Sequence, residues 1–322
     1  MDIDFIKNKR VLVTGGNGFI GSHMVSRLVK AGCKVYVISR DSSDIWRLDE
    51  VKNSISLIKL DMRNGDELSK SVAEVRPDYI FHMAAYGVDS RQKDYVTAAE
   101  TNIIGTVNLV KAAAAVGCEK LLNTGTSMQY GNKKGPITEE DYYSPTNIYG
   151  STKGAATIIA HQIARENDLD IVTIIPFGVF GEKEGSHKFF PHVILSALAE
   201  GEVQLSPCEQ YRDYCYIENI IDGFLMAAEN KQIKSEIFNI GSGKVFQLKH
   251  YVDLIMKRFD EDKKVIYGAV EYRKNDLWSP QPSIEKISAQ LRWQPMVSLE
   301  EGIERTIEWF RDNYKKYSEK GR

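Results

Sequence analysis

Tyr149 and Lys153 are two residues whose types and spacing suggest proton-transfer chemistry. They stand four positions apart at the start of a segment with helical periodicity, so both side chains would project from one face of a helix. A free phenol has a pKa of about 10, and a nearby ammonium group would stabilise the phenolate and lower that pKa. Tyr149 would then exchange a proton with a hydroxyl or a ketone while a hydride moves.

The position of this pair in the chain distinguishes it from a chance match. Tyr130 and Lys134 have the same spacing, but they lie in a segment with glycine and lysine that favours a loop. The hydroxyl cluster Thr124-Gly125-Thr126-Ser127 precedes Tyr149 at the C-terminal end of an expected strand. Doubly wound sheets bind their ligands at that end, where a hydroxyl can orient the reacting oxygen.

A glycine-rich turn near the N-terminus predicts a dinucleotide site. The run from Thr14 to Gly21, with the sequence TGGNGFIG, stands where an expected strand turns into a helix. Such glycines allow a tight turn, close approach of the backbone to a pyrophosphate and close packing of the helix on the strand. Lys153 would then also hold the nicotinamide ribose. The residues expected at the phosphates are Gly15, Gly18, Phe19, Ile20 and Gly21.

The end of the second expected strand bears on which dinucleotide binds. An NAD site usually carries Asp or Glu there for the ribose hydroxyls, whereas this chain has Ser39 and Arg40. Because an arginine suits a 2′-phosphate, the sequence favours NADP(H). The alternative is that Arg40 is a solvated surface charge and Asp41 reaches the ribose, which would fit NAD(H). Asp61, just past the third expected strand, is a candidate for the adenine edge.

Strands that alternate with helices must position these residues. Short β-branched runs alternate with longer amphipathic segments over roughly the first 180 residues. This rhythm predicts parallel βαβ units and an α/β fold with a Rossmann-type doubly wound parallel sheet. The expected strands are residues 10–14, 34–39, 56–60, 78–83, 120–124 and 171–176, and the expected helices include 19–30, 98–116 and 149–165.

The rhythm of strands and helices breaks after Gly181, which indicates a second structural unit. We expect residues 1–180 to form the dinucleotide-binding domain and residues 181–322 to form mainly a smaller α/β substrate domain. The run at 236–240 has the composition of a strand that returns to the first sheet, so the second domain would be interleaved with the first.

Composition narrows the class of protein. The 322 residues carry 42 Lys and Arg against 44 Asp and Glu, a net charge of −2 that does not suggest a nucleic-acid partner. The sequence has neither a signal peptide nor an apolar run of about 20 residues, so we expect no membrane contact and a cytoplasmic location. The 4 cysteines form no CxxC pair and no cluster with histidine, which predicts reduced thiols and no metal site.

These motifs together resemble the extended short-chain dehydrogenase/reductase family, specifically its nucleotide-sugar epimerase, dehydratase and reductase branch. The resemblance covers nearly the whole chain. Besides the glycine turn and Tyr149/Lys153, it rests on His82-Met83-Ala84-Ala85, Asn102 with Gly105-Thr106, Tyr130-Gly131, Pro145 to Ile148, Leu291 to Pro295 and Glu300 to Gly302.

The resemblance implies roles for further residues. It implies Thr126 as the hydroxyl partner of Tyr149 and Lys153, and a homodimer formed through the helices near 96–116 and 149–165. Arg212 and Arg273 resemble the two arginines that clamp the pyrophosphate of a sugar nucleotide. The resemblance also places Met62, Ala84, Ala85, Asn102 and Pro176 at the cofactor, and Ser127, Met128 and Gly178 at the substrate.

Three departures from the family pattern narrow the reaction. Dehydratases of this branch have Asp and Glu after the catalytic Thr, whereas this chain has Ser127 and Met128, which argues against a 4,6-dehydratase. Gly178 stands where many relatives have a phosphate-contacting Asn, and Ile175 where many have Arg, so the resemblance leaves the exact pose of the nucleotide open. The missing acid after the second strand weakens the epimerase interpretation, because epimerases commonly retain NAD.

The leading hypothesis is an NADPH-dependent reductase of a 4-keto nucleotide sugar, with Tyr149 protonating the alkoxide at carbon 4. The close alternative is an NAD-dependent nucleotide-sugar 4-epimerase, which needs the same three catalytic residues. Two other classes are a reductase of a small carbonyl compound without a nucleotide, and a redox-sensing binding protein. The intact Tyr149/Lys153 pair argues against the last of these.

Overall fold

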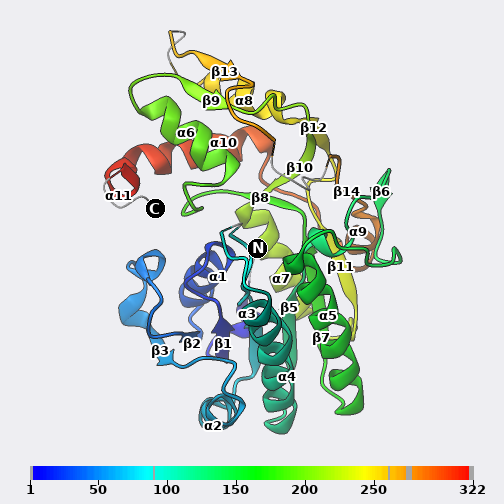
Figure 1. Ribbon diagram of the computed structural model, residues 1–322. Helices are drawn as coiled ribbons and strands as arrows, with labels where there is room; N and C mark the ends of the chain where they lie inside the picture. The colour runs from blue at the N-terminus through cyan, green and yellow to red at the C-terminus, as the bar shows by residue number, and fades with distance from the viewer. Residues whose placement is uncertain (1–2, 90, 260–261, 273–277, 319–322) are drawn as a thin grey trace.

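A seven-stranded parallel sheet forms the centre of the protein, as Figure 1 shows for the computed structural model, which describes residues 3–89, 91–259, 262–272 and 278–318. The strand order is β11-β7-β5-β4-β1-β2-β3, and every neighbouring pair is parallel. The strands are β1 (Arg10–Thr14), β2 (Lys34–Ser39), β3 (Ile55–Lys59), β4 (Tyr79–His82), β5 (Lys120–Thr124), β7 (Ile171–Pro176) and β11 (Ile237–Ile240).

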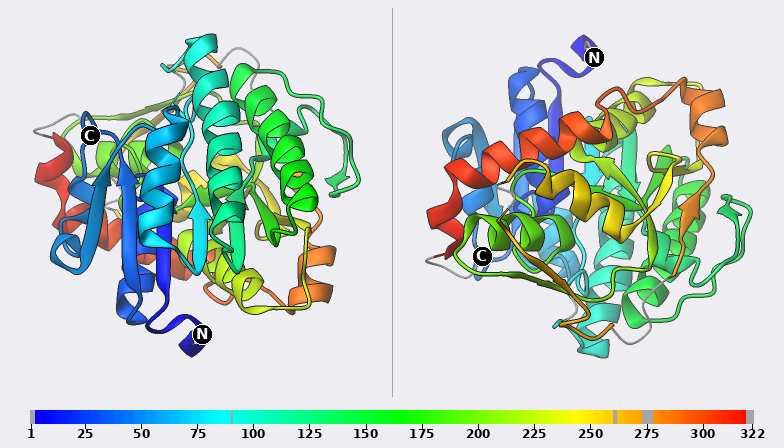
Figure 2. Two further views of the ribbon diagram at one scale, coloured as in Figure 1. Left: turned by 90° about the horizontal axis from the view of Figure 1, so that it is seen from below. Right: turned by 90° about the horizontal axis from the view of Figure 1, so that it is seen from above.

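Alternation of apolar residues buries both faces of this sheet. Leu12 of β1 packs into one hydrophobic cluster, whereas Val11 and Val13 pack into another on the opposite face. One face is covered by α2 (Gly65–Val75), α4 (Gly105–Ala115) and α5 (Ile148–Glu166), and the other by α1 (Phe19–Lys30) and α7 (Ile217–Glu229). Figure 2 shows α4 and α5 side by side along the sheet. The doubly wound α/β class predicted from the sequence is confirmed.

Polar caps fix where the helices next to the site begin. Asn147 accepts a hydrogen bond from Gly150 N at 2.8 Å, so α5 starts immediately before Tyr149. Asp94 caps α3 (Tyr95–Ala99), which continues through a π-helical turn (Glu100–Ile104) into α4. The expected helix at 98–116 therefore begins three residues earlier than predicted and contains a π turn, a feature that periodicity alone does not reveal.

The remaining chain forms a smaller lobe above the C-terminal ends of the strands (Figure 1). It contains a three-stranded sheet, β12-β10-β8, and two small two-stranded sheets. Its strands are β8 (Gly178–Phe180), β9 (Val203–Leu205), β10 (Tyr211–Tyr216), β12 (Val245–Gln247), β13 (Val265–Tyr267) and β14 (Gln281–Pro282), the last paired with β6 (Pro136–Ile137). Its helices are α6 (Phe189–Leu198), α8 (Leu248–Met256), α9 (Glu285–Leu291), α10 (Leu299–Asp312) and α11 (Tyr314–Ser318).

This lobe is interleaved with the first sheet. β11 lies within the later part of the sequence but pairs with β7 at the edge of the central sheet. Helix α7, which follows β10 directly, packs on β5 and β7. The part of the chain that the structure describes also contains four 3-10 turns, namely η1 (Asp4–Ile6), η2 (Trp46–Leu48), η3 (Lys52–Ser54) and η5 (Ser127–Gln129). Within the described ranges, no helix combines the length and apolar character needed to cross a bilayer.

Candidate active site

The first turn of α5 brings Tyr149 to the end of β5. Thr126 follows β5 and caps the short turn η5, where its hydroxyl accepts a hydrogen bond from Met128 N at 3.3 Å. A β-carbon at Gly150 would lie 2.4 Å from Met128 O, so only glycine lets α5 approach η5 this closely. The structure thereby brings together Thr126, Tyr149 and Lys153, three residues of the predicted catalytic group.

Burial shifts both titratable groups of this set. Burial raises the pKa of Tyr149 to about 12, and the hydroxyl of Thr126 opposes that shift. Burial lowers the pKa of Lys153 to about 8. Burial therefore disfavours the charged form of Lys153 when nothing is bound, and an anionic phenolate nearby would stabilise that form. Burial is the main cause of both shifts, so the protonation states of both groups respond to whatever binds beside them.

Gly87 packs directly against Tyr149. Its φ is +97°, and a β-carbon there would lie 3.2 Å from Tyr149 Cβ. Asn102, which lies in the π turn, holds this segment, since its amide donates to Tyr86 O and to Thr152 Oγ1 and accepts from Tyr86 N. Sequence reasoning placed Asn102 at the cofactor but did not detect Gly87 or Thr152 beside Tyr149.

The glycine turn forms a tight cradle between β1 and α1. Gly15 has φ +67°, and a β-carbon there would lie 2.5 Å from Ala84 N. A β-carbon at Gly21 would lie 2.2 Å from Gly15 O, so the first turn of α1 also needs glycine for close packing. Gly18 caps α1, and Phe19 and Ile20 are its first two residues. The backbone N–H groups at this helix start are available for an anion.

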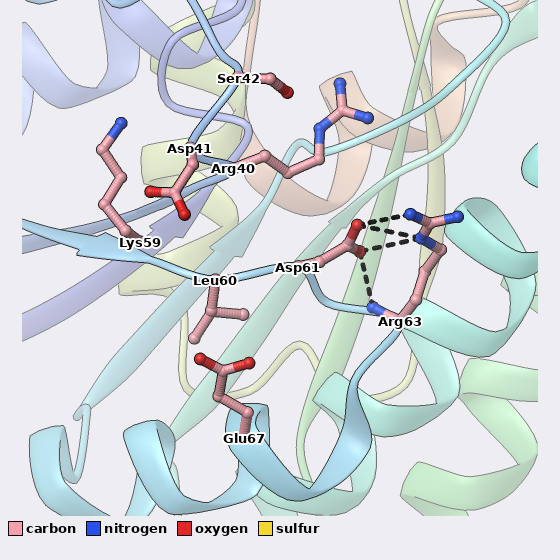
Figure 3. A pocket seen from close by; sticks show the side chains of 8 residues that line it. All are labelled: Arg40, Asp41, Ser42, Lys59, Leu60, Asp61, Arg63 and Glu67. Carbon is pink, nitrogen blue, oxygen red and sulfur yellow. Dashed lines mark hydrogen bonds and ion pairs between the residues drawn. The ribbon is translucent and has the colours of Figure 1, made fainter.

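A polar cavity of about 440 Å³ lies at the ends of β2 and β3 (Figure 3). Arg63 binds the carboxylate of Asp61 with its Nε and Nη2 atoms and keeps the pKa of Asp61 below its usual range. Ser39 is buried at the end of β2, where an acid would bind ribose hydroxyls. The cavity is lined by Arg40, Asp41, Ser42, Lys59, Leu60, Asp61, Arg63 and Glu67.

This arrangement fits a nicotinamide dinucleotide. The glycine cradle excludes side chains where a pyrophosphate would approach. The polar cavity lies at the ends of β2 and β3, and β2 is the neighbour of β1 in the sheet. Ala84 and Ala85 follow β4, and Ala84 N donates to Thr14 Oγ1 at 3.3 Å. Pro176 ends β7, and the buried Met62 follows Asp61. These residues therefore border the same edge of the central sheet.

The residues expected at the substrate are more dispersed. A β-carbon at Gly178 would lie 2.2 Å from Asp213 O, which explains why no larger residue stands there. Arg212 lies on β10, half-buried, and donates from Nη1 to Tyr211 O at 2.7 Å. Ser127 and Met128 form η5 next to Thr126, without a carboxylate in either position. Arg273 lies outside the described residues.

The chain has the features of a dinucleotide-dependent enzyme of the Rossmann type. These are the parallel sheet, the glycine cradle and the Tyr149/Lys153 pair. The model of the NAD dependent epimerase/dehydratase family matches residues 11–241. The chain belongs to that family. The matched residues include the strands of the central sheet and β10. This match confirms the family resemblance that the sequence motifs indicated.

Among the relatives with assigned activities, several UDP-glucose 4-epimerases match along nearly their whole length. The chain is 30% identical over 322 residues to a UDP-glucose 4-epimerase of Mycolicibacterium smegmatis, which covers 94% of this chain and 99% of that protein. It is similar to the crystal structure of UDP-glucose 4-epimerase from Thermotoga maritima with UDP-glucose, with a TM-score of 0.87, 27% identity and coverage of 94% and 99%. The Thermus thermophilus UDP-glucose 4-epimerase in complex with NAD gives a TM-score of 0.84, 26% identity and the same coverage of 94% and 99%.

Proposed function

We propose that this enzyme is an NADPH-dependent reductase of a 4-keto nucleotide sugar. The observation that carries the choice is the cavity at the ends of β2 and β3, where Arg40 and Lys59 line the wall and Ser39 replaces the usual acid. A 2′-phosphate needs cations and hydrogen-bond donors there, whereas free ribose hydroxyls favour a carboxylate. Asp41 in the same wall is the group that would favour NAD(H).

Tyr149, assisted by Lys153 and Thr126, would donate a proton to the substrate. When bound, the reduced dinucleotide supplies a hydride to carbon 4 of the sugar. Tyr149 would donate its phenolic proton to the oxygen on carbon 4, and the Lys153 ammonium would stabilise the phenolate that remains. Thr126 would hydrogen-bond the same oxygen and orient the ketone. Ser127 and Met128 supply no base, so abstraction of a proton from carbon 5 is not expected.

The nucleotide part of the substrate would bind under the smaller lobe. Relatives include enzymes named for UDP-glucose, and one solved structure holds that molecule. We propose that Arg212, with Arg273, contacts the pyrophosphate of the sugar nucleotide, as guanidinium groups match phosphate geometry. Gly178, Ser127 and Met128 would line the sugar. The residues proposed at the cofactor are Gly15, Gly18, Phe19, Ile20, Gly21, Ser39, Arg40, Asp61, Met62, Ala84, Ala85, Asn102, Lys153 and Pro176.

A titration with both dinucleotides tests this proposal. Nucleotide-free protein should bind NADPH more tightly than NADH, and Arg40→Ala should remove that preference while leaving the affinity for NADH unchanged. Purified enzyme should then consume NADPH in the presence of a 4-keto sugar nucleotide. Equal or tighter binding of NADH by the unaltered protein would overturn the cofactor assignment. Arg212→Ala should raise KM for the sugar nucleotide, and an unchanged KM would favour a small carbonyl substrate.

The alternative is an NAD-dependent nucleotide-sugar 4-epimerase. The relative at 30% identity and both solved structures described above carry that activity in their names. An epimerase would oxidise carbon 4, turn the ketone and return the hydride with the same three residues. NAD that co-purifies with the enzyme, together with redox-neutral interconversion of two sugar nucleotides, would favour this alternative.

We further propose a homodimer built on the helices beside the active site. Large apolar side chains stand exposed on α3, the π turn and α5, which pack against one another. They are Tyr95 at 71%, Val96 at 64%, Ile158 at 62% and Ile104 at 49% exposure. Exposed apolar side chains on helices that pack against one another favour association. Val96→Lys with Ile158→Lys should give a monomer in analytical ultracentrifugation, whereas an unchanged dimer would exclude this face.

The four cysteines are free thiols, and three of them are buried. Burial raises the pKa of Cys215 and Cys118, which keeps these thiols protonated and unreactive. Free, unpaired thiols suit a reducing compartment, so we propose the cytoplasm as the location. Cell fractionation followed by an activity assay tests this location, and active enzyme found in an oxidising compartment would contradict it.

A further inference from the structure

The loop after β8 is held by three separate elements through three consecutive carbonyl groups. Glu182 O accepts a hydrogen bond from His23 Nε2 of α1 at 2.8 Å. Lys183 O accepts from Arg47 Nε of η2 at 2.7 Å, and Glu184 O accepts from the Tyr317 hydroxyl of α11 at 2.8 Å. Residues 182–184 thus join the glycine helix, the segment after β2 and the C-terminal helix.

Aromatic packing joins two of these elements directly. The ring of Trp46 in η2 meets the ring of Tyr317 edge-on at 5.8 Å and the ring of Trp309 at 6.5 Å. Arg47 lies over Trp46, with its Cζ atom 4.6 Å from the ring centre. Tyr317 is only 3% exposed although it lies near the end of the chain. Trp46, Arg47, Trp309, Tyr317 and the carbonyls of Lys183 and Glu184 are here called the C-terminal clasp.

The C-terminal clasp lies next to the cavity proposed for the adenosine half of the cofactor. Both Figure 1 and Figure 2 place α11 beside the segment that follows β2. That segment begins with Arg40 and Ser42 of the cavity wall and reaches Arg47 a few residues later. Asn17 of the glycine turn donates to Asp44 O at 3.3 Å, and Arg47 Nη1 lies 3.4 Å from Asn17 O. One short segment is therefore tied to the glycine turn, the cavity and the C-terminal helix.

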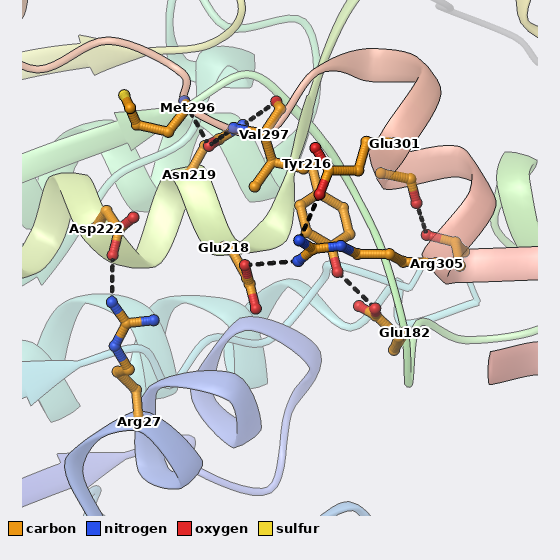
Figure 4. A network of polar contacts seen from close by, with 12 residues as sticks. Arg27, Glu182, Tyr216, Glu218, Asn219, Asp222, Met296, Val297, Glu301 and Arg305 are labelled. Atoms are coloured by element: carbon orange, nitrogen blue, oxygen red, sulfur yellow. Dashed lines mark hydrogen bonds and ion pairs between the residues drawn. The ribbon is translucent and has the colours of Figure 1, made fainter. Parts of the chain in front are cut away.

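The same loop is tied to the substrate side. The hydroxyl of Tyr216 donates to Glu182 Oε1 at 2.5 Å, and Arg305 of α10 binds Glu218 Oε2 at 3.0 Å (Figure 4). Tyr216 ends β10, the strand that carries Arg212, and α10 packs against β10. Residues 182–184 therefore contact both the smaller lobe, through Tyr216, and the segment that follows β2, through Arg47.

We propose that Tyr317 is a positioning residue for the cofactor. Through the C-terminal clasp it holds residues 40–47 against the glycine turn, so the C-terminal helix becomes part of the adenosine site without touching the dinucleotide. A wall segment that is already ordered need not lose conformational freedom on binding, and this strengthens affinity. The inference rests on the proposed placement of the adenosine half in this cavity, but not on the choice between NADPH and NADH.

Cofactor titrations of Tyr317→Ala test the proposal. Kd should rise about tenfold for both NADPH and NADH, within the range usual for energetic coupling between sites. Kd for reduced nicotinamide mononucleotide, which lacks the adenosine half, should stay unchanged, as should kcat at saturating cofactor. Tyr317→Phe keeps the ring but loses the bond to Glu184 O, so it should recover most of the affinity. Tyr314→Ala, at a half-buried position of the same helix, is the matched control and should bind normally.

Two results would overturn the role of Tyr317. Unchanged Kd for both dinucleotides in Tyr317→Ala would show that the C-terminal clasp does not position the cavity wall. Equal loss of affinity for reduced nicotinamide mononucleotide would point to general destabilisation. Should Tyr317→Ala not fold, Trp46→Phe and Trp46→Leu probe the clasp from the other side with the same readouts. If instead Arg40→Ala and Ser42→Ala leave every affinity unchanged, the placement of the adenosine half fails independently of Tyr317.

Discussion

The hydroxyl of Thr14 donates a hydrogen bond to Nδ1 of the buried His82 over 2.7 Å. The direction follows from the neighbouring bonds. Thr106 uses its single hydroxyl proton on Asn102 O at 2.6 Å, so its oxygen must accept from His82 Nε2, 2.9 Å away. Burial lowers the pKa of His82 to about 3, and the neutral ring therefore carries its proton on Nε2 and accepts at Nδ1.

This bond is part of a chain that connects the glycine turn to α5, the helix that carries Tyr149 and Lys153. Thr14 immediately precedes the glycine turn, and its oxygen accepts from Ala84 N. At the other end, the Asn102 amide donates to Thr152 Oγ1 at 2.9 Å, one residue before Lys153. A buried network whose donors and acceptors are matched holds its members in one arrangement. We infer that the chain keeps the glycine turn and the start of α5 in register.

Replacing the ring of His82 should destabilise the protein and weaken cofactor binding together. His82→Phe removes the acceptor of the Thr14 hydroxyl proton and the donor to the Thr106 oxygen, while the bonds to Ala84 N and Asn102 O remain. A buried donor left without its acceptor costs roughly 1–3 kcal/mol. Urea unfolding should show that loss, and KM for the dinucleotide should rise. His82→Gln can donate from its amide and accept at its carbonyl, so it should recover part of both. His250→Phe, at a half-buried histidine stacked on Phe246, is the control, and an equal effect there would contradict the prediction.

A methyl group at Gly87 should impair turnover more than binding. Gly87→Ala places a β-carbon 3.2 Å from Tyr149 Cβ at a φ of +97°, so either the segment or the tyrosine must move. Small displacements of a reacting group lower rates by up to about 100-fold. Steady-state kinetics should show a fall in kcat with a nearly unchanged Kd for the dinucleotide.

Gly117→Ala is the matched control for this substitution. Its φ is +69°, yet a β-carbon there would meet no atom within 4 Å. Gly117→Ala introduces the same kind of backbone strain, because of the positive φ, but makes no contact with Tyr149. If Gly117→Ala lowers kcat as much as Gly87→Ala, backbone strain rather than displacement of Tyr149 is the cause.

Local patterns were sufficient to predict the sheet and the residues that lie on its edge. The β-branched runs at 10–14 and 34–39 are the observed strands, because burial on both faces leaves a continuous apolar signature. Tyr149 and Lys153 share a helix, so their spacing alone places them on one face. The spacing of the glycines in the sequence is enough to predict the tight turn, because that turn needs residues without side chains.

Contacts between distant parts of the chain could not be predicted in this way. Thr14 and His82 are 68 positions apart, and Tyr317 and Glu184 are 133 apart. Neither pair has a periodic pattern, since each contact depends on how strands are ordered in the sheet and where a loop crosses it. Gly178 appeared as a missing phosphate ligand, whereas in the structure the backbone of β10 leaves no room for a side chain there.

The proposed reduction should slow above about pH 8. Burial lowers the pKa of Lys153 to about 8, so the free enzyme carries the ammonium below that pH and loses it above. Tyr149 stays protonated throughout, because burial raises its pKa to about 12. Since kcat/KM reports the free enzyme, kcat/KM for the reduced dinucleotide should fall as pH rises through 8.

Lys153→Arg separates this cause from others. A guanidinium remains charged at every pH of the assay, so the variant should show a lower kcat/KM without the fall near pH 8. A fall at the same pH in Lys153→Arg would assign the titration to a different group. Tyr149→Phe completes the set, with turnover abolished and dinucleotide affinity retained.

Neutralising Glu184 should stabilise the protein at alkaline pH. Glu184 Oε2 is buried and has no hydrogen-bond partner among the residues that the structure describes. Burial raises the pKa of this carboxyl to about 8, although Lys188 and Arg47 oppose the shift. The folded protein therefore holds a proton between about pH 4.5 and 8 that the unfolded chain releases, so stability falls as pH rises through that window.

Glu184→Gln keeps the shape of the side chain and removes the titration. Its free energy of unfolding should exceed that of the unaltered protein at pH 8 but not at pH 5, with a difference that grows by up to about 1.4 kcal/mol per pH unit. Urea midpoints measured between pH 5 and 8 report this directly, with the exposed Glu140→Gln as control. Parallel curves for Glu184→Gln and the unaltered protein would mean that Glu184 is ionised when folded. In that case the charges of Lys188 and Arg47 compensate the burial of the carboxylate.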